Sequence, residues 1–215
     1  MTEHAALVDG DPIPRAHVDT FLDTHFRGAG NCATSHDDRA PARRHQESPS
    51  AARQRRRWAT QIVVTDELAR RACTERGLKP PQAQPLTVAE PDVADLGSIV
   101  ATALAHSPAA RTLLSALESE QTVPETAVQD YYTRNQDRFL TQEALRRGAD
   151  PFNGTEPGDI QPYEAVREDI ARELKKAAGR HAFFGWLDQA RSGVTYSHGH
   201  EHPGDPSHPD HEHRH

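Results

Sequence analysis

Apolar residues recur at helical spacing through most of this chain, and the longest such run constrains the fold most. Between residues 163 and 190 one face recurs in steps of three or four, at Tyr163, Val166, Ile170, Leu174, Ala177 or Ala178, His181, Phe184 and Leu187. This period places them on one side of a helix. The run predicts a single helix of about seven turns. It also puts His181 on the apolar face, where we expect a hydrogen-bonded core histidine.

Shorter runs with the same spacing predict further helices. They cover residues 14–26, a helix from about residue 51, another from Thr65 to Gly77, and residues 93–104, 107–117 and 122–139. Thr65 and Thr122 are the expected N-caps, since a threonine oxygen can accept from the free N–H groups of a first helical turn. The segments 27–50 and 140–162 are rich in Gly, Pro and polar residues, which predicts loops.

Two short β-prone segments lie at opposite ends of this helical region. Residues 5–8 form a brief apolar run that Gly10 and Pro12 close, and residues 194–196 follow the end of the long helix. Each segment alone would leave unpaired backbone groups beside the core. We therefore predict that they pair, which gives a mainly α fold with a small strand pair joining the two ends of one domain, residues 1–196.

The composition is polar for a chain of 215 residues. Hydrophobic residues make up 35%, against about 45–50% in a typical globular domain. Much of the chain is therefore expected outside a core. The formal net charge of −7 argues against nucleic acid as a partner. The arginine-rich run at residues 53–57 is interpreted as the solvated face of a helix, the alternative being a nucleic-acid patch.

Several features predict a cytoplasmic protein with no membrane partner. No apolar run approaches the roughly 20 residues that span a bilayer. The first residues show neither the basic nor the hydrophobic region of a signal peptide. Cys32 and Cys73 are the only cysteines, and two free thiols suit a reducing compartment better than a disulfide framework.

The segment from Ser197 to the C-terminus is rich in histidine and has no apolar residue to bury. Its seven histidines are His198, His200, His202, His208, His211, His213 and His215. We expect a disordered tail that binds a divalent metal such as Zn, Ni or Cu, because imidazole is a common ligand for these ions. The alternatives are a solvated tail with no ligand role and a purification tag.

Other histidines offer weaker candidates. His25, Cys32, His36 and His45 lie close together in the chain and could form a zinc site, but their spacing matches no standard finger, and an irregular polar loop is the alternative. His106 precedes a Ser-Pro pair and is expected to cap a helix or face solvent.

Three motifs in this order resemble the SurA/PrsA type of parvulin-linked peptidyl-prolyl isomerase chaperone. The first is Val8-Asp-Gly-Asp-Pro-Ile13, similar to that family's opening strand. The second combines Val123-Pro-Glu with Val128, Tyr131, Tyr132, Asn135 and Phe139, and looks like the helix before the isomerase domain. The third is the periodic run from Tyr163 through Arg180, Phe184 and Leu187, which looks like the helix that returns after it.

The resemblance implies a helical chaperone domain of the SurA N-terminal type, with one part missing. A parvulin domain would sit between the second and third motifs, where only residues 140–162 are present. That is too short for a domain with its own core, so we expect no catalytic residues. The aromatic residues that could bind a client polypeptide, or instead form the core, are Trp58, Tyr131, Tyr132, Phe139, Phe183 and Trp186.

Three functional hypotheses follow. The first is a non-catalytic chaperone that holds an unfolded or partner polypeptide and carries a metal-binding tail. The second is a cytoplasmic metal-storage or metal-delivery protein whose helical domain docks on a recipient, such as a metalloprotein. The third is a residual peptidyl-prolyl isomerase, against which the missing domain argues.

Overall fold

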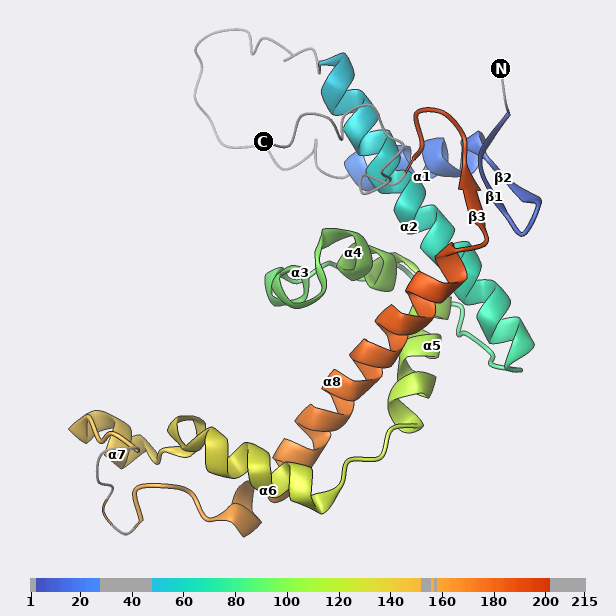
Figure 1. Ribbon diagram of the computed structural model, residues 1–215. Helices are drawn as coiled ribbons and strands as arrows, with labels where there is room; N and C mark the ends of the chain where they lie inside the picture. Colours follow the sequence, from blue (N-terminus) through green and yellow to red (C-terminus); the bar gives the residue numbers. More distant parts are fainter. Residues whose placement is uncertain (1–2, 28–47, 152–155, 157, 202–215) are drawn as a thin grey trace, which may run out of the picture. The chain divides into compact units, whose positions relative to one another are not determined.

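A computed structural model describes residues 3–27, 48–151, 156 and 158–201 of the chain (Figure 1). These fall into two compact units. Unit 1 comprises residues 1–113 and 187–215, and unit 2 comprises residues 114–186. The fold is mainly helical with a small antiparallel sheet, which confirms the predicted class. None of the described helices is long and apolar enough to cross a membrane.

Unit 1 is built around one long helix. Its elements are α1 (Arg15–Arg27), α2 (Pro49–Glu75), α3 (Glu90–Leu96), α4 (Ser98–His106) and the start of α5 (Pro108–Ser119). The predicted helix start at Thr65 is wrong, because α2 runs through it. The Thr65 hydroxyl donates to the Gln61 carbonyl at 2.7 Å, so its hydrogen bond lies within the helix and does not cap a helix start. The cap is instead Ser48, whose oxygen accepts from the Ala51 N–H at 3.1 Å.

The helix predicted over residues 93–104 is divided in two. Gly97 lies between α3 and α4 with a φ of 76°, a conformation that glycine adopts without the steric cost of a Cβ atom. The predicted start of the next helix is confirmed, since the Ser107 hydroxyl accepts from the Ala110 N–H at 3.0 Å.

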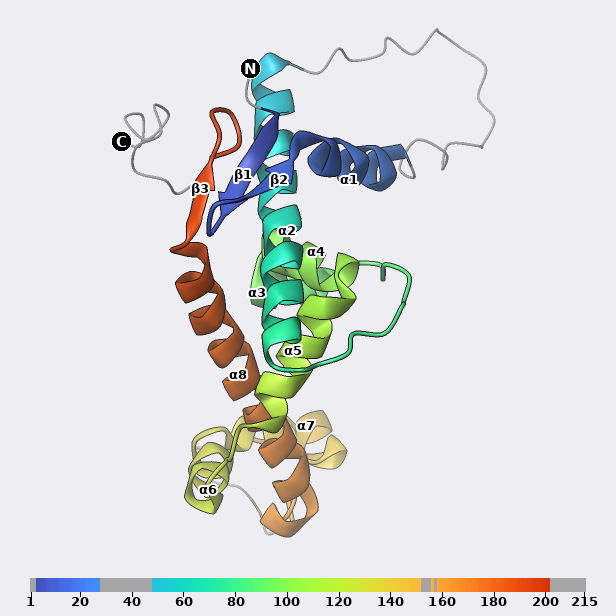
Figure 2. The same cartoon turned by 90° about the vertical axis from the view of Figure 1, so that its right-hand side faces the viewer.

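A three-stranded sheet joins the ends of unit 1 (Figure 2). Its strands β1 (His4–Val8), β2 (Asp11–Pro14) and β3 (Val194–Tyr196) have the order β2-β1-β3, and both pairings are antiparallel. The predicted strand pair is confirmed, with Ala6 opposite Tyr196. β2 was expected as a turn. It forms because Asp9 and Gly10 both have positive φ, as a tight hairpin turn requires.

The sheet, α1 and α2 share one apolar core. Its buried members are Ala5, Val18, Phe21, Ala59, Ile62 and Ala103. The large side chains come from α1 and α2, and the small Ala5 of β1, Ala59 of α2 and Ala103 of α4 fill the space between them. Pro12 and Pro14 lie in β2, which is at the edge of the sheet, the position where a strand tolerates residues without an N–H.

Unit 2 contains the remaining helices. They are α6 (Glu125–Arg134), the 3₁₀ helix η2 (Gln136–Phe139), α7 (Gln142–Arg147) and most of α8 (Tyr163–Arg191), which confirms the long predicted helix. The helix predicted over residues 122–139 is shorter, and Thr122 does not cap it, because Pro124 occupies the N-cap position.

The segment 140–162 is not wholly irregular, contrary to the prediction. Thr141 caps α7 by accepting from the Ala144 N–H at 3.3 Å, and Gly148 ends it with a φ of 71°. Leu140 then pairs with Ile160 in an isolated antiparallel bridge. Six helical residues are too few for the periodicity that identified the other helices.

The core of unit 2 lies between α6 and α8. Val128, Val166 and Ile170 are its buried members. At the ends of these helices, Arg167 makes two hydrogen bonds of 2.7 Å to the Glu125 carboxylate. These bonds, with one from Tyr163, lower the pKa of Glu125 to about 2. The carboxylate therefore stays ionised and links the two helices at any ordinary pH.

Further along α8 the buried face differs from the predicted one. His181 is exposed, so its predicted core role is wrong, and Gly179 and Phe183 are buried instead. Leu187 is buried, as predicted. A Cβ atom on Gly179 would lie 2.7 Å from the Cα and Cβ atoms of Glu118 in α5. Glycine at this position thus permits α5 and α8 to touch.

The two glycines of α8 give a matched pair of substitutions. Gly179→Ala should destabilise the protein by about 1–3 kcal/mol, because backbone atoms must move apart. Gly185→Ala should be neutral or stabilise it by up to about 1 kcal/mol, since a Cβ atom there would meet no atom within 4 Å beyond the adjacent backbone of its own helix, and alanine favours the helix. Denaturant unfolding of both variants measures these changes. Equal effects of the two substitutions would contradict the close approach of α5 and α8.

Candidate functional site

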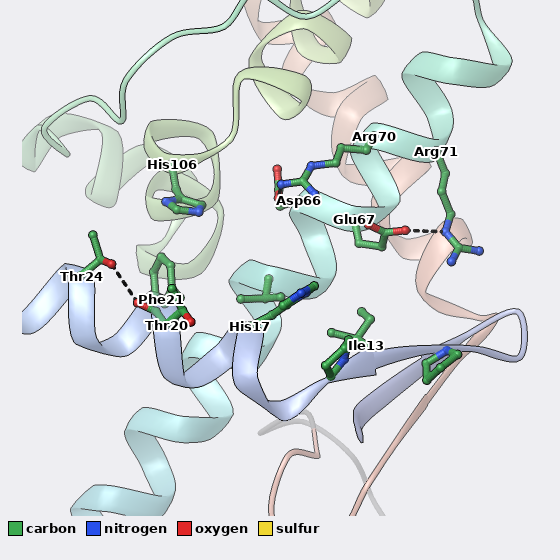
Figure 3. Close-up of a pocket in the computed structure, with 13 residues that line it drawn as sticks. Ile13, His17, Thr20, Phe21, Thr24, Asp66, Glu67, Arg70, Arg71 and His106 are labelled. Atoms are coloured by element: carbon green, nitrogen blue, oxygen red, sulfur yellow. Dashed lines mark hydrogen bonds and ion pairs between the residues drawn. The ribbon is translucent and has the colours of Figure 1, made fainter. Parts of the chain in front are cut away.

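An open groove lies on unit 1 between α1, α2, β2 and the end of α4 (Figure 3). Its volume is about 610 Å³. Ile13, Phe21 and Val63 contribute its apolar surface, while His17, Thr20 and Thr24 line it from α1. This volume falls in the range of clefts that bind ligands, about 300–1,000 Å³.

Paired charges form the α2 side of the groove. Asp66 is 7% exposed and forms an ion pair with Arg70 at 2.5 Å. Arg71 contacts Glu67 at 3.0 Å and Asp11 at 3.1 Å, and it also donates to the Val8 carbonyl at 3.2 Å. Arg71 therefore fixes the β1–β2 hairpin to α2. Since each carboxylate has a cation beside it, the groove combines an apolar floor with a locally neutral rim.

An aromatic cluster forms the inner wall of the groove. The Phe21 ring lies 4.9 Å from the His106 ring in an edge-on contact, 5.4 Å from His25 in a stacked one, and 5.8 Å from Trp58. Burial lowers the pKa of His106, so its imidazole is neutral at pH 7. The expectation that His106 caps a helix or faces solvent is thus wrong, because it packs on Phe21.

A second hollow of about 270 Å³ continues the groove. It shares Asp66, Arg70 and His106 with the first and is bounded by the prolines Pro80, Pro81 and Pro108. Few features of the sequence indicate this groove. Its residues, with those of the second hollow, come from six separate elements and connections, and only the clustered prolines at residues 80 and 81 indicate an extended segment there.

The predicted client-binding residues lie in clusters in the two units. Trp58 packs against Phe21 and His25 in unit 1 and does not line the groove. In unit 2, Tyr131, Tyr132 and Phe139 form one cluster, and Phe183 and Trp186 form another. Phe183 is 1% exposed, so it contributes to packing. The exposed large apolar residues of the described chain are Leu86, Val93 and Leu145.

The C-terminal tail was predicted to be disordered from Ser197, and this is wrong for its first five residues. Ser197 donates its N–H to the Ala5 carbonyl at 2.9 Å. His200 then donates to the Ser197 carbonyl at 2.9 Å, which closes a turn in which Gly199 has a φ of 85°. Glu201 lies 3.7 Å from Arg57. Residues 197–201 therefore pack on unit 1 as part of its ordered structure.

This turn separates the first two histidines of the predicted metal site. His198 is exposed, whereas His200 is 3% exposed, with its Nδ1 atom 2.8 Å from the Thr60 hydroxyl oxygen. The two side chains therefore do not lie on one side of an extended chain. The other five proposed ligands lie outside the described residues, as do Cys32, His36 and His45 of the possible zinc loop. In the described part of the chain no three His, Cys, Asp or Glu residues form a metal-binding group.

The burial of His200 changes its protonation. Desolvation, with further effects from Arg15 and Arg56, lowers its pKa to about 4. The imidazole is therefore neutral at pH 7. Cys73 shows a parallel effect: burial raises the pKa of its thiol, and the sulfur lies 3.4 Å from the Ala109 carbonyl oxygen. The thiol is therefore protonated near neutral pH and is a weak nucleophile.

Comparison of the chain with protein-family models, curated proteins and solved structures found no match.

His198 and His200 provide a test of the ordered turn. His200→Asn should cost about 2–4 kcal/mol of unfolding free energy at pH 7, because it leaves a cavity and disturbs a buried hydrogen bond. His198→Asn should cost less than about 0.5 kcal/mol, as expected for an exposed residue. Urea unfolding of the two variants checks this. Similar stabilities would mean that residues 197–201 do not pack on α2.

The same pair tests the lowered pKa. A histidine whose pKa falls from 6.5 to about 4 on folding stabilises the native state fully above pH 6.5. That contribution is lost as the pH falls through 4. The difference in stability between wild type and His200→Asn should therefore shrink between pH 6.5 and 4. A difference independent of pH would show that His200 titrates normally.

Proposed function

We propose that this chain is a non-catalytic polypeptide-holding protein of the SurA/PrsA type, which holds an extended segment of another polypeptide in the groove of unit 1. The groove carries this proposal. It is open, with apolar surface at Ile13, Phe21 and Val63 and a charge-balanced rim. Such a surface can contact apolar side chains without selecting one charge, which suits a holder of varied clients.

The way the ends of the chain meet also supports the proposal. β1 and β3 pair, and the three motifs that carry the family resemblance occur in β1 and β2, in α6 and in α8. Between α6 and α8 the described residues form only η2, α7 and the bridge from Leu140 to Ile160. A segment of this size suits a chaperone without an isomerase domain. Cis/trans isomerisation of an X-Pro peptide faster than its slow uncatalysed rate would instead favour the residual-isomerase hypothesis.

We further propose that the His-rich segment binds a divalent metal, and that the protein works in the cytoplasm. The density of imidazole after residue 197 supports the first proposal, and the buried free thiol of Cys73 suits a reducing compartment. Metal handling is the second candidate function, in which unit 1 docks on a recipient protein. Under that hypothesis the groove binds one specific partner and not unfolded chains in general.

A groove-blocking substitution tests the polypeptide-holding function. Thr20 is exposed on α1 and lines the groove, whereas Ala16 is exposed on the same helix and does not. Thr20→Trp should weaken binding of an unfolded client about tenfold, which corresponds to about 1.4 kcal/mol, and should reduce suppression of client aggregation. Ala16→Trp adds similar bulk and should leave both unchanged. Equal activity of the two variants would place client binding elsewhere.

Calorimetry with Ni²⁺ tests metal binding. Deleting residues 202–215 should remove most bound metal and leave the melting temperature unchanged. Deleting residues 197–215 should also lower the melting temperature, because it removes the contacts of His200 and Glu201. Binding should weaken below about pH 6.5, since protons compete for imidazole nitrogens. Equal stoichiometry in full-length and truncated protein would contradict metal binding by the tail.

A further inference from the structure

Three consecutive residues of β2 line the groove of unit 1 (Figure 3): Pro12, Ile13 and Pro14. Successive side chains of a strand point to opposite faces of its sheet. A surface lined by all three residues therefore runs along the edge of the strand and not along one face. Because β2 is the outer strand in the order β2-β1-β3, this is the edge to which the extended chain of a client could be added.

The direction of each β2 nitrogen follows from the pairing of β2 with β1. Just after β2, the Arg15 N–H donates to the Glu3 carbonyl at 3.1 Å, so it points toward the β1 side. Main-chain groups along an antiparallel strand alternate between the partner strand and the opposite side. The nitrogen of Ile13 therefore points toward β1 as well, and those of Pro12 and Pro14 point outward, toward the free edge.

Both outward positions are occupied by proline, which has no N–H group. Over Pro12 and Pro14 the free edge thus offers carbonyl acceptors and no donor. A strand ladder needs a donor and an acceptor at each hydrogen-bonded pair, so an added client strand would leave its own carbonyls unpaired. The threonines of α1 do not replace these donors, because the Thr20 and Thr24 hydroxyls donate to the Ala16 and Thr20 carbonyls at 2.7 and 2.9 Å.

The charged side chains of the rim favour an uncharged occupant. Asp66 is paired with Arg70 at 2.5 Å, and Glu67 is paired with Arg71 at 3.0 Å. A charged client group would have to compete with these ion pairs, whereas an apolar side chain can contact Ile13 without disturbing them. The occupant that complements the groove is therefore an uncharged apolar segment that forms no main-chain ladder with β2.

We propose that Pro12 and Pro14 determine the specificity of the groove: they prevent a client from adding a strand to β2, so that an extended uncharged segment is held by its apolar side chains alone. This inference rests on the proposed polypeptide-holding function. A client then needs no free main-chain N–H groups. Proline-rich segments, which are poor partners in a strand ladder, belong to the substrate class as fully as other apolar segments.

Two peptides test this on the full-length wild-type protein. One is an uncharged peptide of leucine and alanine, and the other is the same peptide with every amide nitrogen methylated. The two affinities should agree within about threefold, whereas loss of a ladder of several hydrogen bonds would separate them by about tenfold or more. A separation of that size would overturn the inference and leave the polypeptide-holding function standing. Absence of binding by both peptides would overturn both.

The double substitution Pro12→Ala and Pro14→Ala restores two N–H groups to the edge of β2. It should tighten binding of the unmodified peptide about tenfold and leave binding of the methylated peptide unchanged. Pro91→Ala is the control, because Pro91 is an exposed proline of α3 that lines neither hollow, and it should change neither affinity.

Unchanged affinity for the unmodified peptide in a folded double variant would contradict the blocking role of the two prolines. A dimer of the double variant in sedimentation, absent from the wild type, would support that role, because a restored edge can pair with a second copy of itself. Should the double variant unfold, the comparison of the two peptides on the wild-type protein decides.

Discussion

The structure of unit 1 depends on a row of buried polar side chains on α2. Thr60, Gln61 and Thr65 are each fully buried, and buried polar side chains are normally hydrogen-bonded. The two threonine hydroxyls donate to carbonyls within α2. Each of the three residues has a further partner from the far end of the chain: His200, Tyr196 and Arg191 respectively. The C-terminal strand is thus held by specific polar contacts as well as by its pairing with β1.

This arrangement explains why the ends of the chain meet where they do. β3 has three residues, too few to fix its register by apolar alternation alone. The contact of Tyr196 with Gln61 places Tyr196 opposite Ala6, and the adjacent turn places His200 against Thr60. Gly193 completes the approach, since a Cβ atom there would meet the Asp9 carboxylate at 2.3 Å. Polar contacts and one glycine therefore position a strand that hydrophobic burial would leave poorly defined.

Two features were predicted well from the sequence: the long helix, whose apolar residues recur over many turns, and the pairing of two short strands from opposite ends of the chain. The seven-turn run of α8 and the pairing of β1 with β3 needed only spacing and the requirement that backbone groups be satisfied. Two of the failures, those at Thr65 and His200, had a common physical origin, because both concerned polar residues that tertiary contacts bury. Thr65 resembles a cap and His200 resembles a tail residue, and nothing local in the sequence distinguishes a buried polar residue from an exposed one. The groove was missed for a related reason, since it is formed by separate elements.

Two faces of α2 have different roles in unit 1. With about 100° between successive residues, Thr60, Gln61 and Thr65 gather on one side of the helix, and Val63, Asp66 and Arg70 gather on another. The first face contacts the C-terminal residues Tyr196 and His200, and the second lines the groove. The groove has its own supports in the ion pair of Asp66 with Arg70 and the packing of Phe21 on His106. The side chains that hold the C-terminal segment are therefore not the ones that line the groove.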